Sequence, residues 1–431
     1  MIATIKPHKL SGHAMVPGSK SHTIRAVLLA TMSKGRSVIH NPLLSLDCRN
    51  ALATARLFGA QVEDQGNTWV VDGLGRDLKV PDNYLDCGNS GSVAYFATPM
   101  AALVDGYTFV TGDEQIRRRP IDETISAINE LGGFAAASRP GSTSCPVVVR
   151  GVLKGGTAHF GGQLSQIVSG VMMVAPLLEQ DTEILVKDPK EKPYLDITFD
   201  WMNRYGIQVE NPADYTRFVI PGRRAYTPAE TTISGDWSGV AFPLVAALVT
   251  GSDIVIDAVN FQDSQGDKAV VDRLIEMGAD IEKDFANSRL VVHGGTALKG
   301  GTTIDMRDIP DSLPALSVAA AFADQDTHFI GLAHVRLKET DRVAVMAEEL
   351  AKMGVAVEIG PDDMVVHGGR KVCGARVASH GDHRVAMALI ACGLAAEGCT
   401  QVENAECAAV SFPNFFEVMN NMGAGIERES E

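Results

Sequence analysis

The chain has 431 residues, of which 45% are hydrophobic and 42 are glycines, and this composition predicts a globular protein of roughly two to three domains. A formal net charge of −15 at pH 7 argues against a nucleic-acid-binding surface, and makes small anions the expected ligands wherever basic residues cluster. No apolar run reaches the roughly 18 residues of a membrane span, and seven scattered cysteines without a CxxC pair indicate reduced thiols in a cytoplasm and no zinc site.

Taken in chain order, the sequence repeats one unit six times, at a period of about 65 residues. Each unit has a polar corner, an apolar helix, a strand, a second helix and closing strands. The first helices are apolar on all sides, which is typical of buried helices, and they are too short to span a bilayer. We expect them at residues 26–31, 94–103, 167–178, 240–249, 315–323 and 385–396.

The second helix of every unit ends at a glycine, which predicts a left-handed C-terminal cap. These glycines are Gly59, Gly132, Gly206, Gly278, Gly354 and Gly423. Strands follow the first five of these helices, at residues 68–71, 147–149, 218–220, 290–292 and 364–366. The pattern predicts an α/β protein in which sheets cover buried core helices.

The six units divide into three plus three, which predicts two similar lobes. We expect residues 19–234 to form the N-terminal lobe, and residues 1–18 with 235–431 to form the C-terminal lobe. The first strands precede the first unit, so they are available to cross over and complete the other lobe. The two linking strands then lie near Gly18 and Ser234, with a ligand cleft between lobes that close on a bound anion.

The corners of the N-terminal lobe hold the first candidate site residues. Just before a helix, Gly18 allows a ligand to approach the backbone, and Lys20 and Arg25 add positive charge. The segment at residues 17–25 is not a Walker loop, because it lacks the upstream glycine of that motif. The turn at residues 87–92 is either a plain helix cap or a set of donors for a ligand. Arg119 ends a run of three arginines, which favours binding of an anion.

In the C-terminal lobe, charged residues crowd the turn at residues 338–342, between a buried strand expected at 329–333 and a helix. This turn is either a solvated helix start with capping carboxylates or a site that holds a phosphate or carboxylate beside an acid. Asp311 is likewise either an N-cap or a reacting acid. His380 with its neighbours Asp382 and His383 could suggest a metal, but their spacing before a helix argues against one.

Together these motifs resemble, in order and spacing, those of the 5-enolpyruvylshikimate-3-phosphate synthase family, from Lys20 to Phe416. The most specific are Lys338-Glu339-Thr340-Asp341-Arg342 and Asp382-His383-Arg384. The others are Pro17-Gly18-Ser19-Lys20-Ser21, Gly88-Asn89-Ser90-Gly91, Arg119-Pro120-Ile121, Ser165-Gln166, Lys192-Pro193-Tyr194-Leu195-Asp196-Ile197-Thr198, Ile309-Pro310-Asp311 and Phe412-Pro413-Asn414-Phe415-Phe416. The sister enzyme that acts on UDP-N-acetylglucosamine is less similar, because residues 111–119 lack its cysteine.

The resemblance implies two lobes of three βαβαββ units each, an inside-out α/β barrel, and transfer of the enolpyruvyl group of phosphoenolpyruvate to shikimate 3-phosphate. It implies neither metal nor organic cofactor, and we expect a monomer whose partners are small anionic substrates. By motif, Lys20, Asp311 and Glu339 are catalytic. Residues implied to bind phosphoenolpyruvate are Lys20, Asn89, Gly91, Arg119, Gln166, Arg342 and Arg384. Residues implied to bind the acceptor are Lys20, Ser21, Arg25, Ser165, Gln166, Tyr194, Asp311 and Lys338.

The chain also departs from the family pattern. Tyr95 and Val410 stand where the family has cations on the phosphoenolpyruvate side. On the acceptor side, Leu164 replaces a phosphate-binding serine, and Glu191 places a carboxylate at another phosphate-binding position. His334 stands where asparagine is frequent. A carboxylate at Glu191 would repel a phosphate unless it turns away or is neutralised by Lys190 or Lys192.

Two alternative functions follow from these departures. One is a member of the same family that acts on a different cyclic alcohol, with or without a phosphate group, or by a different reaction in the same cleft. The other is a non-catalytic binding protein. The intact set of Lys20, Asp311 and Glu339 argues against the second alternative, because binding alone does not require acid and base groups.

Overall fold

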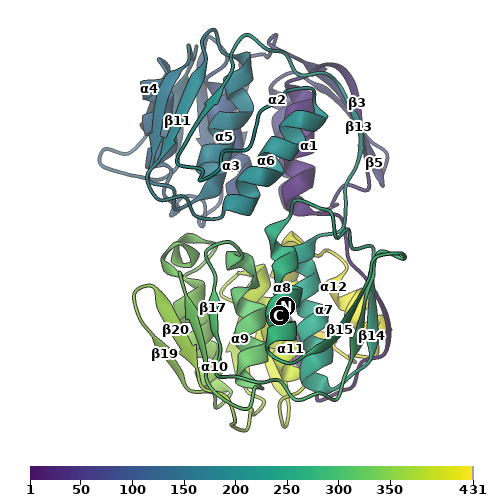
Figure 1. Cartoon of the computed structure of the whole chain (residues 1–431). Coiled ribbons are helices and arrows are strands. Elements are labelled where there is room, and N and C mark those ends of the chain that lie inside the picture. Colours follow the sequence, from purple (N-terminus) through teal and green to yellow (C-terminus); the bar gives the residue numbers. More distant parts are fainter. Residues whose placement is uncertain (430–431) are drawn as a thin grey trace. The chain divides into compact units, whose positions relative to one another are not determined.

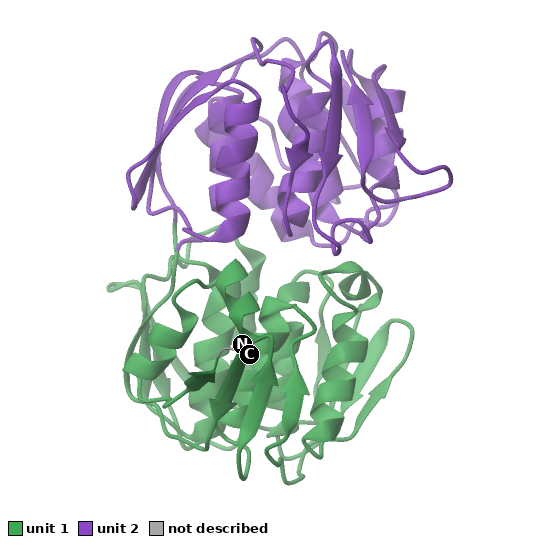
Figure 2. Ribbon diagram, turned by 180° about the vertical axis from the view of Figure 1, so that it is seen from behind, with its two compact units in different colours: residues 1–17, 234–431 green, residues 18–233 purple. Residues whose placement is uncertain are grey.

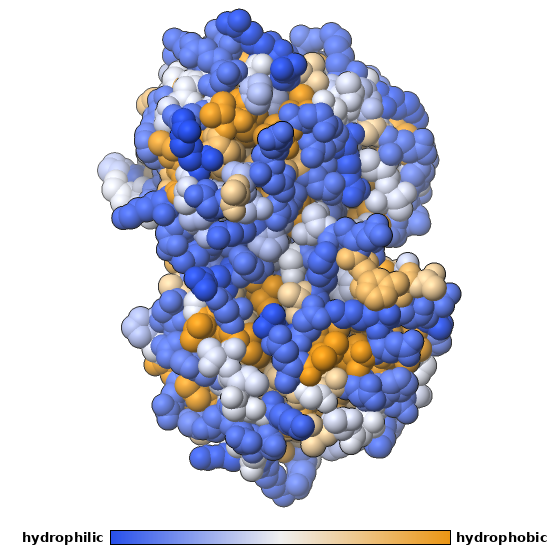
Figure 3. Space-filling model, in the orientation of Figure 1, coloured by the Kyte–Doolittle hydropathy of each residue, from blue (hydrophilic) through white to orange (hydrophobic). Residues whose placement is uncertain are grey.

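The computed structural model describes residues 1–429 and consists of helices and mixed β-sheets (Figure 1). The chain divides into two compact units (Figure 2). Unit 1 comprises Met1–Pro17 and Ser234–Glu431, and unit 2 comprises Gly18–Ile233. In the described part of the chain, no helix is long and apolar enough to cross a membrane. Hydrophilic residues cover most of the face drawn in Figure 3, as expected from the high net charge.

Three buried helices form the core of unit 2. They are α1 (Lys20–Thr31), α3 (Gly91–Ala101) and α5 (Ser165–Val174). The predicted burial is confirmed, since every residue of α1 from His22 onward is buried. The helix α5 ends before the predicted residue 178, because Pro176 has no amide hydrogen to continue it, and a 3-10 turn (Ala175–Leu177) follows. The more exposed second helices are α2 (Leu46–Leu57), α4 (Asp122–Glu130) and α6 (Lys192–Arg204).

Three sheets flank these helices, and Figure 1 shows helices of unit 2 between the sheet that contains β11 and the sheet that contains β3. The first sheet has the order β13 (Glu230–Thr232), β3 (Lys34–His40), β5 (Thr68–Leu74), β4 (Gln61–Asp64). The second has the order β6 (Leu85–Asp86), β7 (Tyr107–Thr111), β9 (Val147–Arg150), β8 (Phe134–Ala137). The third has the order β10 (Gly156–Phe160), β11 (Thr182–Val186), β12 (Arg217–Ile220).

Unit 1 repeats this arrangement of helices. Its buried helices are α7 (Trp237–Thr250), α9 (Leu313–Ala321) and α11 (His383–Gly393), and its outer helices are α8 (Ala269–Glu276), α10 (Arg342–Lys352) and α12 (Phe415–Asn421). One hydrophobic cluster joins the three buried helices to the strands around them. All six glycines predicted to follow the outer helices have positive φ angles, between 85° and 96°, which confirms the left-handed caps.

The first strands of the chain pair within the sheets of unit 1. The first sheet of unit 1 has the strand order β15 (Asp280–Asp284), β16 (Arg289–His293), β14 (Ile254–Asp257), β2 (Gly12–Met15). The second has the order β17 (Thr303–Asp305), β18 (Thr327–Ile330), β20 (Asp363–Val366), β19 (Val357–Ile359). The third has the order β21 (Arg376–Ala378), β22 (Thr400–Glu403), β1 (Ile2–Ile5), β23 (Glu427–Glu429). The strand β2 pairs with β14 in parallel, and β1 pairs with β22 in antiparallel register.

The strand predicted at residues 329–333 ends earlier than expected. Gly331 has a φ of 73°, and a Cβ atom there would lie 2.6 Å from Cγ of Arg307, so only glycine fits where the chain leaves β18. A 3-10 helix, η4 (Ala333–Leu337), then leads to the charged turn before α10. The turn therefore brings Lys338 and Glu339 to the N-terminus of α10, next to the core helices.

Candidate active site

The charged motif of unit 1 is organised around Arg342, the first residue of α10, whose side chain is 0% exposed. Its Nη1 lies 2.7 Å from Oδ1 of Asp311, and its Nη2 lies 2.5 Å from Oε2 of Glu339. Its Nε donates a hydrogen bond of 2.8 Å to Oδ2 of Asp382, which is also fully buried. Three carboxylates thus surround one guanidinium, and this pairing permits the burial of so many charges.

A second arginine, Arg384 in the first turn of α11, contacts the same cluster. Its Nη2 lies 2.8 Å from Oδ2 of Asp311 and 2.9 Å from Oγ of Ser238. Its Nη1 donates to Nε2 of His383 across 2.7 Å. Asp311, in the 3-10 turn η3 (Pro310–Ser312), therefore binds a different arginine with each carboxylate oxygen.

These charges fix the protonation of the cluster. Burial by itself would raise the pKa of the Asp311 carboxyl. The positive charges of Arg384 and Arg342, and then of Lys338, outweigh burial and hold this pKa well below its usual range. Burial would lower the pKa of Arg342, but the carboxylates led by Asp382 outweigh it and raise this pKa above its ordinary value. Asp311 is therefore an ionised carboxylate in direct contact with two cations.

Unit 2 holds the other predicted residues, and the first of these lie on α1. Nζ of Lys20 lies 3.2 Å from Oδ2 of Asp47. Arg25 is buried, and it donates from Nη1 to Oγ of Ser21 (2.7 Å) and from Nη2 to the carbonyl oxygen of Tyr194 (3.2 Å). Its Nε donates to Oγ1 of Thr198 across 2.9 Å. Arg25 thereby links the start of α1 to the start of α6. Ser21 on α1 and Tyr194 on α6 are both predicted to bind the acceptor.

The burial of Arg25 also changes its acidity. Loss of water lowers the pKa of this guanidinium to about 9, against the opposing effect of Tyr194. The guanidinium carbon lies 4.9 Å from the ring centre of Phe96, within the range of a cation–π contact. Burial and this set of partners are features of a residue that positions its neighbours.

Several of the residues predicted to bind phosphoenolpyruvate lie near the start of α3. A Cβ atom on Gly91 would lie 2.1 Å from Nη1 of Arg119, so glycine is required for this guanidinium to rest on the helix N-terminus. Nε2 of Gln166 donates to Oγ of Ser92 across 3.0 Å, which holds the first turn of α5 against that of α3. Nδ2 of Asn89 lies 2.6 Å from Oδ2 of Asp113.

Glu191 makes a contact that the sequence did not predict. Its Oε2 accepts hydrogen bonds from the amide (3.0 Å) and the hydroxyl (2.7 Å) of Ser165, the first residue of α5. Nζ of Lys190, one of the two lysines considered as neutralising partners, lies 2.8 Å from Oδ1 of Asp188. The carboxylate is turned toward Ser165, a residue predicted to hold the acceptor.

The other departures from the family pattern are partly or fully buried. The hydroxyl of Tyr95 donates to the carbonyl oxygen of Pro120 across 2.9 Å, and the ring is 2% exposed. Leu164 and His334 are also buried, and Val410 ends the 3-10 helix η5 (Ala405–Val410). Tyr95 therefore fills space in the core of unit 2.

Sequence reasoning missed several partners of the site. Asp382 lies in a recognised motif, but no role was predicted for it at the N-cap of α11, where it holds Arg342. Asp47 and Ser238 had no local signal, because neither lies in a charged motif. Thr198 lies within a recognised motif, yet its bond to Arg25 depends on the packing of α6 against α1.

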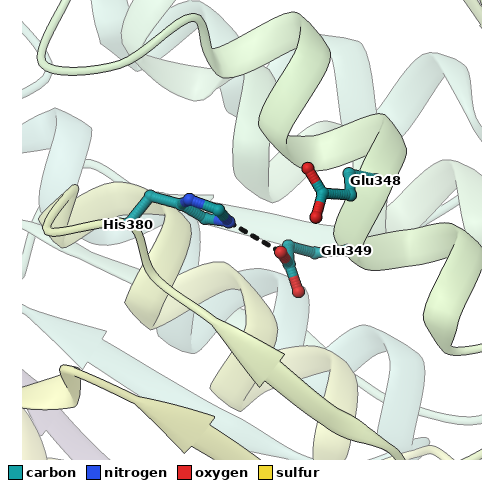
Figure 4. Close-up of side chains that lie close together, drawn as sticks. All are labelled: Glu348, Glu349 and His380. Carbon is teal, nitrogen blue, oxygen red and sulfur yellow. Dashed lines mark hydrogen bonds and ion pairs between the residues drawn. The ribbon is translucent and has the colours of Figure 1, made fainter.

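His380, which was considered as a possible metal ligand, points toward Glu349 on α10 (Figure 4). Its Nε2 lies 2.7 Å from Oε1 of Glu349, and Glu348 is nearby. Nζ of Lys352 lies 2.8 Å from Glu349 and 3.1 Å from Glu348. Burial would raise the pKa of Glu349, but hydrogen bonds led by that from Lys352 lower it. The ammonium group already supplies the positive charge, so these residues form an ion-pair network.

Comparison with known proteins identifies the class. The family model described as EPSP synthase (3-phosphoshikimate 1-carboxyvinyltransferase) matches residues 5–419. A 3-phosphoshikimate 1-carboxyvinyltransferase of Ruminiclostridium cellulolyticum is 42% identical over 427 residues, which cover 99% of this chain and 100% of the relative. The relative of the same name from Methanocaldococcus jannaschii is 37% identical over 427 residues, 98% of each chain. The structure of EPSP synthase from Acinetobacter baumannii matches with a TM-score of 0.83 and 26% identity over 100% of both chains.

The fold and these relatives thus define an α/β transferase. The chain belongs to the EPSP synthase family, and its activity is the enolpyruvyl transfer of the shikimate pathway. The resemblance stated from the sequence motifs is confirmed.

Proposed function

We propose that the chain transfers the enolpyruvyl group of phosphoenolpyruvate to a hydroxyl of shikimate 3-phosphate and releases phosphate. The observation that carries this proposal is the position of Asp311 between Arg342 and Arg384, with Glu339 on the same guanidinium. Two cations able to bind an anionic substrate are in direct contact with two carboxylates able to move protons. A protein that only binds its ligand does not need this combination.

The arginines also supply a means of changing the basicity of Asp311. Phosphoenolpyruvate carries about three negative charges, so several cations must surround it. Arg342 and Arg384 in unit 1, and Lys20 and Arg119 in unit 2, are the cations that we assign to it, with Asn89, Gly91 and Gln166 as further contacts. When a substrate anion engages the two arginines, Asp311 loses part of the charge that lowers its pKa, and it becomes a better proton acceptor.

The chemistry then requires two proton transfers that offset each other. The acceptor hydroxyl loses its proton as its oxygen bonds to C2 of phosphoenolpyruvate, while the C3 methylene gains a proton. In the second step the bond between C2 and the phosphate oxygen breaks and phosphate leaves. C3 loses the proton that it gained, and the double bond between C2 and C3 forms again. We assign these transfers to Asp311 and Glu339, with assistance from Lys20.

The acceptor is assigned to residues at the starts of α1, α5 and α6 together with Lys338. The residues are Lys20, Ser21, Arg25, Ser165, Gln166, Tyr194, Asp311 and Lys338. Arg25 is buried and bonded to Ser21 and to the backbone of Tyr194, so we infer that it acts by holding these two residues in place.

We further propose that each unit is a lobe of three βαβαββ repeats in an inside-out α/β barrel, with residues 19–234 as one domain and 1–18 with 235–431 as the other. A shared pairing pattern supports this proposal. In every sheet, one central strand pairs in parallel with one neighbour and in antiparallel register with the other; these central strands are β3, β7, β11, β14, β18 and β22. We propose that the enzyme acts as a cytoplasmic monomer on small anions.

The test is a product assay with both substrates. The purified chain is mixed with phosphoenolpyruvate and shikimate 3-phosphate, and released phosphate and the enolpyruvyl ether are measured in the same samples. We expect the two products in equal amounts. Phosphate without the ether would indicate hydrolysis, and neither product would overturn the proposal. The contact of Glu191 with Ser165 favours a second candidate acceptor, an unphosphorylated cyclic alcohol. A parallel assay with shikimate in place of shikimate 3-phosphate tests this candidate.

A further inference from the structure

Glu349 is a buried acidic residue that has no assigned part in the proposed reaction. It lies on α10 about two helical turns after Arg342, so the two side chains share one face of that helix. The side chain of Glu349 is 0% exposed. A carboxylate that is removed from water requires donors around it, so the donors that surround Glu349 are the groups that it holds in place.

Two of these donors belong to the segment that leads into α11. Oε2 of Glu349 accepts a hydrogen bond of 3.0 Å from the amide of Ala378, the last residue of β21. Its Oε1 lies 2.7 Å from Nε2 of His380. The third donor, Lys352, lies on α10 itself, with its Nζ 2.8 Å from Oε1. Glu349 therefore fastens the turn at residues 378–381 to α10 at two points.

The backbone of this turn adopts a conformation that needs support. His380 has a φ of 54° and Gly381 has a φ of 74°, so two consecutive residues are left-handed. This region is unfavourable for His380, because its Cβ atom crowds the following carbonyl oxygen. The hydroxyl of Ser379 accepts a hydrogen bond of 3.1 Å from the amide of Gly381. The turn is thus held by Ser379 from within and by Glu349 from α10.

The position of the turn matters because Asp382 follows it directly. The amide of Asp382 donates to the carbonyl oxygen of Ser379 across 3.0 Å. The carboxylate of Asp382 accepts hydrogen bonds from Nε of Arg342 (2.8 Å) and from the amide of Arg384 (2.9 Å). These are the two arginines of unit 1 that we assign to phosphoenolpyruvate. A shift of the turn therefore moves Asp382 and, with it, both arginines.

We propose that Glu349 is a positioning residue, whose carboxylate fixes the turn at residues 378–381 and thereby holds Asp382 where it orients Arg342 and Arg384 for phosphoenolpyruvate. This inference rests on the proposed enolpyruvyl transfer for the ligand of the two arginines, and it assigns Glu349 no contact with a substrate. Guanidinium groups bind an anion through directed hydrogen bonds, so a small displacement of the two arginines weakens binding. The acceptor should be affected less, because most of the residues assigned to it lie in unit 2.

The test compares Glu349→Ala and Glu349→Gln with the native chain and with Glu348→Ala. Glu348 is the matched control, because it precedes Glu349 on α10, lies 3.1 Å from the same Lys352 and is 58% exposed. We expect the KM for phosphoenolpyruvate to rise about tenfold or more in Glu349→Ala, while the KM for shikimate 3-phosphate stays within about twofold of the native value. Glu349→Gln keeps an oxygen for the amide of Ala378, so its rise should be smaller. Native KM values in both Glu349 variants, or an equal rise in Glu348→Ala, overturn the proposal.

A role in stability alone predicts a different result. In that case Glu349→Ala lowers the melting temperature, and both KM values stay at their native levels. Hydrogen–deuterium exchange of the amides of residues 378–384 provides a readout that is independent of turnover. We expect these amides to exchange faster in Glu349→Ala than in the native chain or in Glu348→Ala, and equal protection in a folded variant overturns the proposal. If the native chain forms no product, the proposed reaction fails, and the exchange still decides whether Glu349 holds the turn.

Discussion

Arg384 lies 2.8 Å from Asp311, and this contact joins the first turn of α11 to the 3-10 turn that precedes α9. The two residues come from separate motifs, and each is buried against a core helix. The contact has two consequences. It holds in place a guanidinium that we propose to bind an anion, and the positive charge of that guanidinium helps to keep the carboxylate ionised. The proposed catalytic role of Asp311 therefore depends on a competition for the same arginine.

The first prediction concerns the proton-transfer groups. Asp311→Asn and Glu339→Gln each keep the size of the side chain and remove its ability to exchange a proton. We expect each variant to lower turnover by about 10²–10⁴, which is the usual effect of losing a positioned acid or base. Phosphate release measures turnover, and circular dichroism checks the fold. Glu183→Gln serves as the charge control, and near-native turnover in both site variants would contradict the assignment.

The second prediction concerns the close approach of Arg119 to Gly91. The change Gly91→Ala places a Cβ atom where Nη1 of Arg119 now lies, so the guanidinium must move. Because the clash is with the end of a flexible side chain, we expect a small effect on stability and at least a tenfold rise in the KM for phosphoenolpyruvate.

A helix glycine with room for a methyl group gives the matched control for this variant. In Gly239→Ala, the nearest atom to the added Cβ is 3.7 Å away, and the KM for phosphoenolpyruvate should stay within a factor of about two to three of the native value. Equal KM values for Gly91→Ala and Gly239→Ala would show that Arg119 does not bind this substrate.

Much of the fold was predictable because its signals are local. The six glycines with φ angles near 90° and the apolar core helices follow from residue types at regular spacing. The motifs that hold Asp311, Glu339 and Arg342 were also visible in the sequence. The contacts between motifs were not, because the bond of Glu191 to Ser165 or of Asp382 to Arg342 depends on how helices pack. The charge of Glu191 predicted repulsion of a phosphate, but it could not predict the two hydrogen bonds that this carboxylate accepts from Ser165.

The third prediction concerns stability in acid. The pKa of Asp311 in the folded chain lies well below its ordinary value of 3.8, so the unfolded chain takes up this proton first as the pH falls. The stabilisation from ionised Asp311 is therefore fully present above about pH 4 and is lost progressively below it. Denaturant unfolding at pH values from 3 to 7 measures the effect. We expect Asp311→Asn to show a smaller loss between pH 4 and pH 3 than the native chain, and parallel profiles would contradict the low pKa.

The last prediction concerns the buried pair of Arg342 and Asp382, both 0% exposed at the side chain. Arg342→Met leaves the carboxylate of Asp382 buried without its partner, and breaking a buried ion pair in this way costs about 3–5 kcal/mol in the free energy of unfolding. Asp382→Asn removes the negative charge and retains an oxygen that can cap α11, where Asp382 now accepts a hydrogen bond of 2.9 Å from the amide of Arg384.

The double variant Arg342→Met with Asp382→Asn should therefore be more stable than Arg342→Met alone, although it carries one more substitution. Urea unfolding of the native chain, both single variants and the double variant forms a double-mutant cycle that measures this coupling. Asp305→Asn with Arg307→Met is the exposed control, because that pair is joined at the surface and exposed pairs contribute only about 0–1 kcal/mol. If the two losses at Arg342 and Asp382 simply add, the pair does not stabilise the cluster, and the position of Arg342 must depend on Asp311 and Glu339 instead.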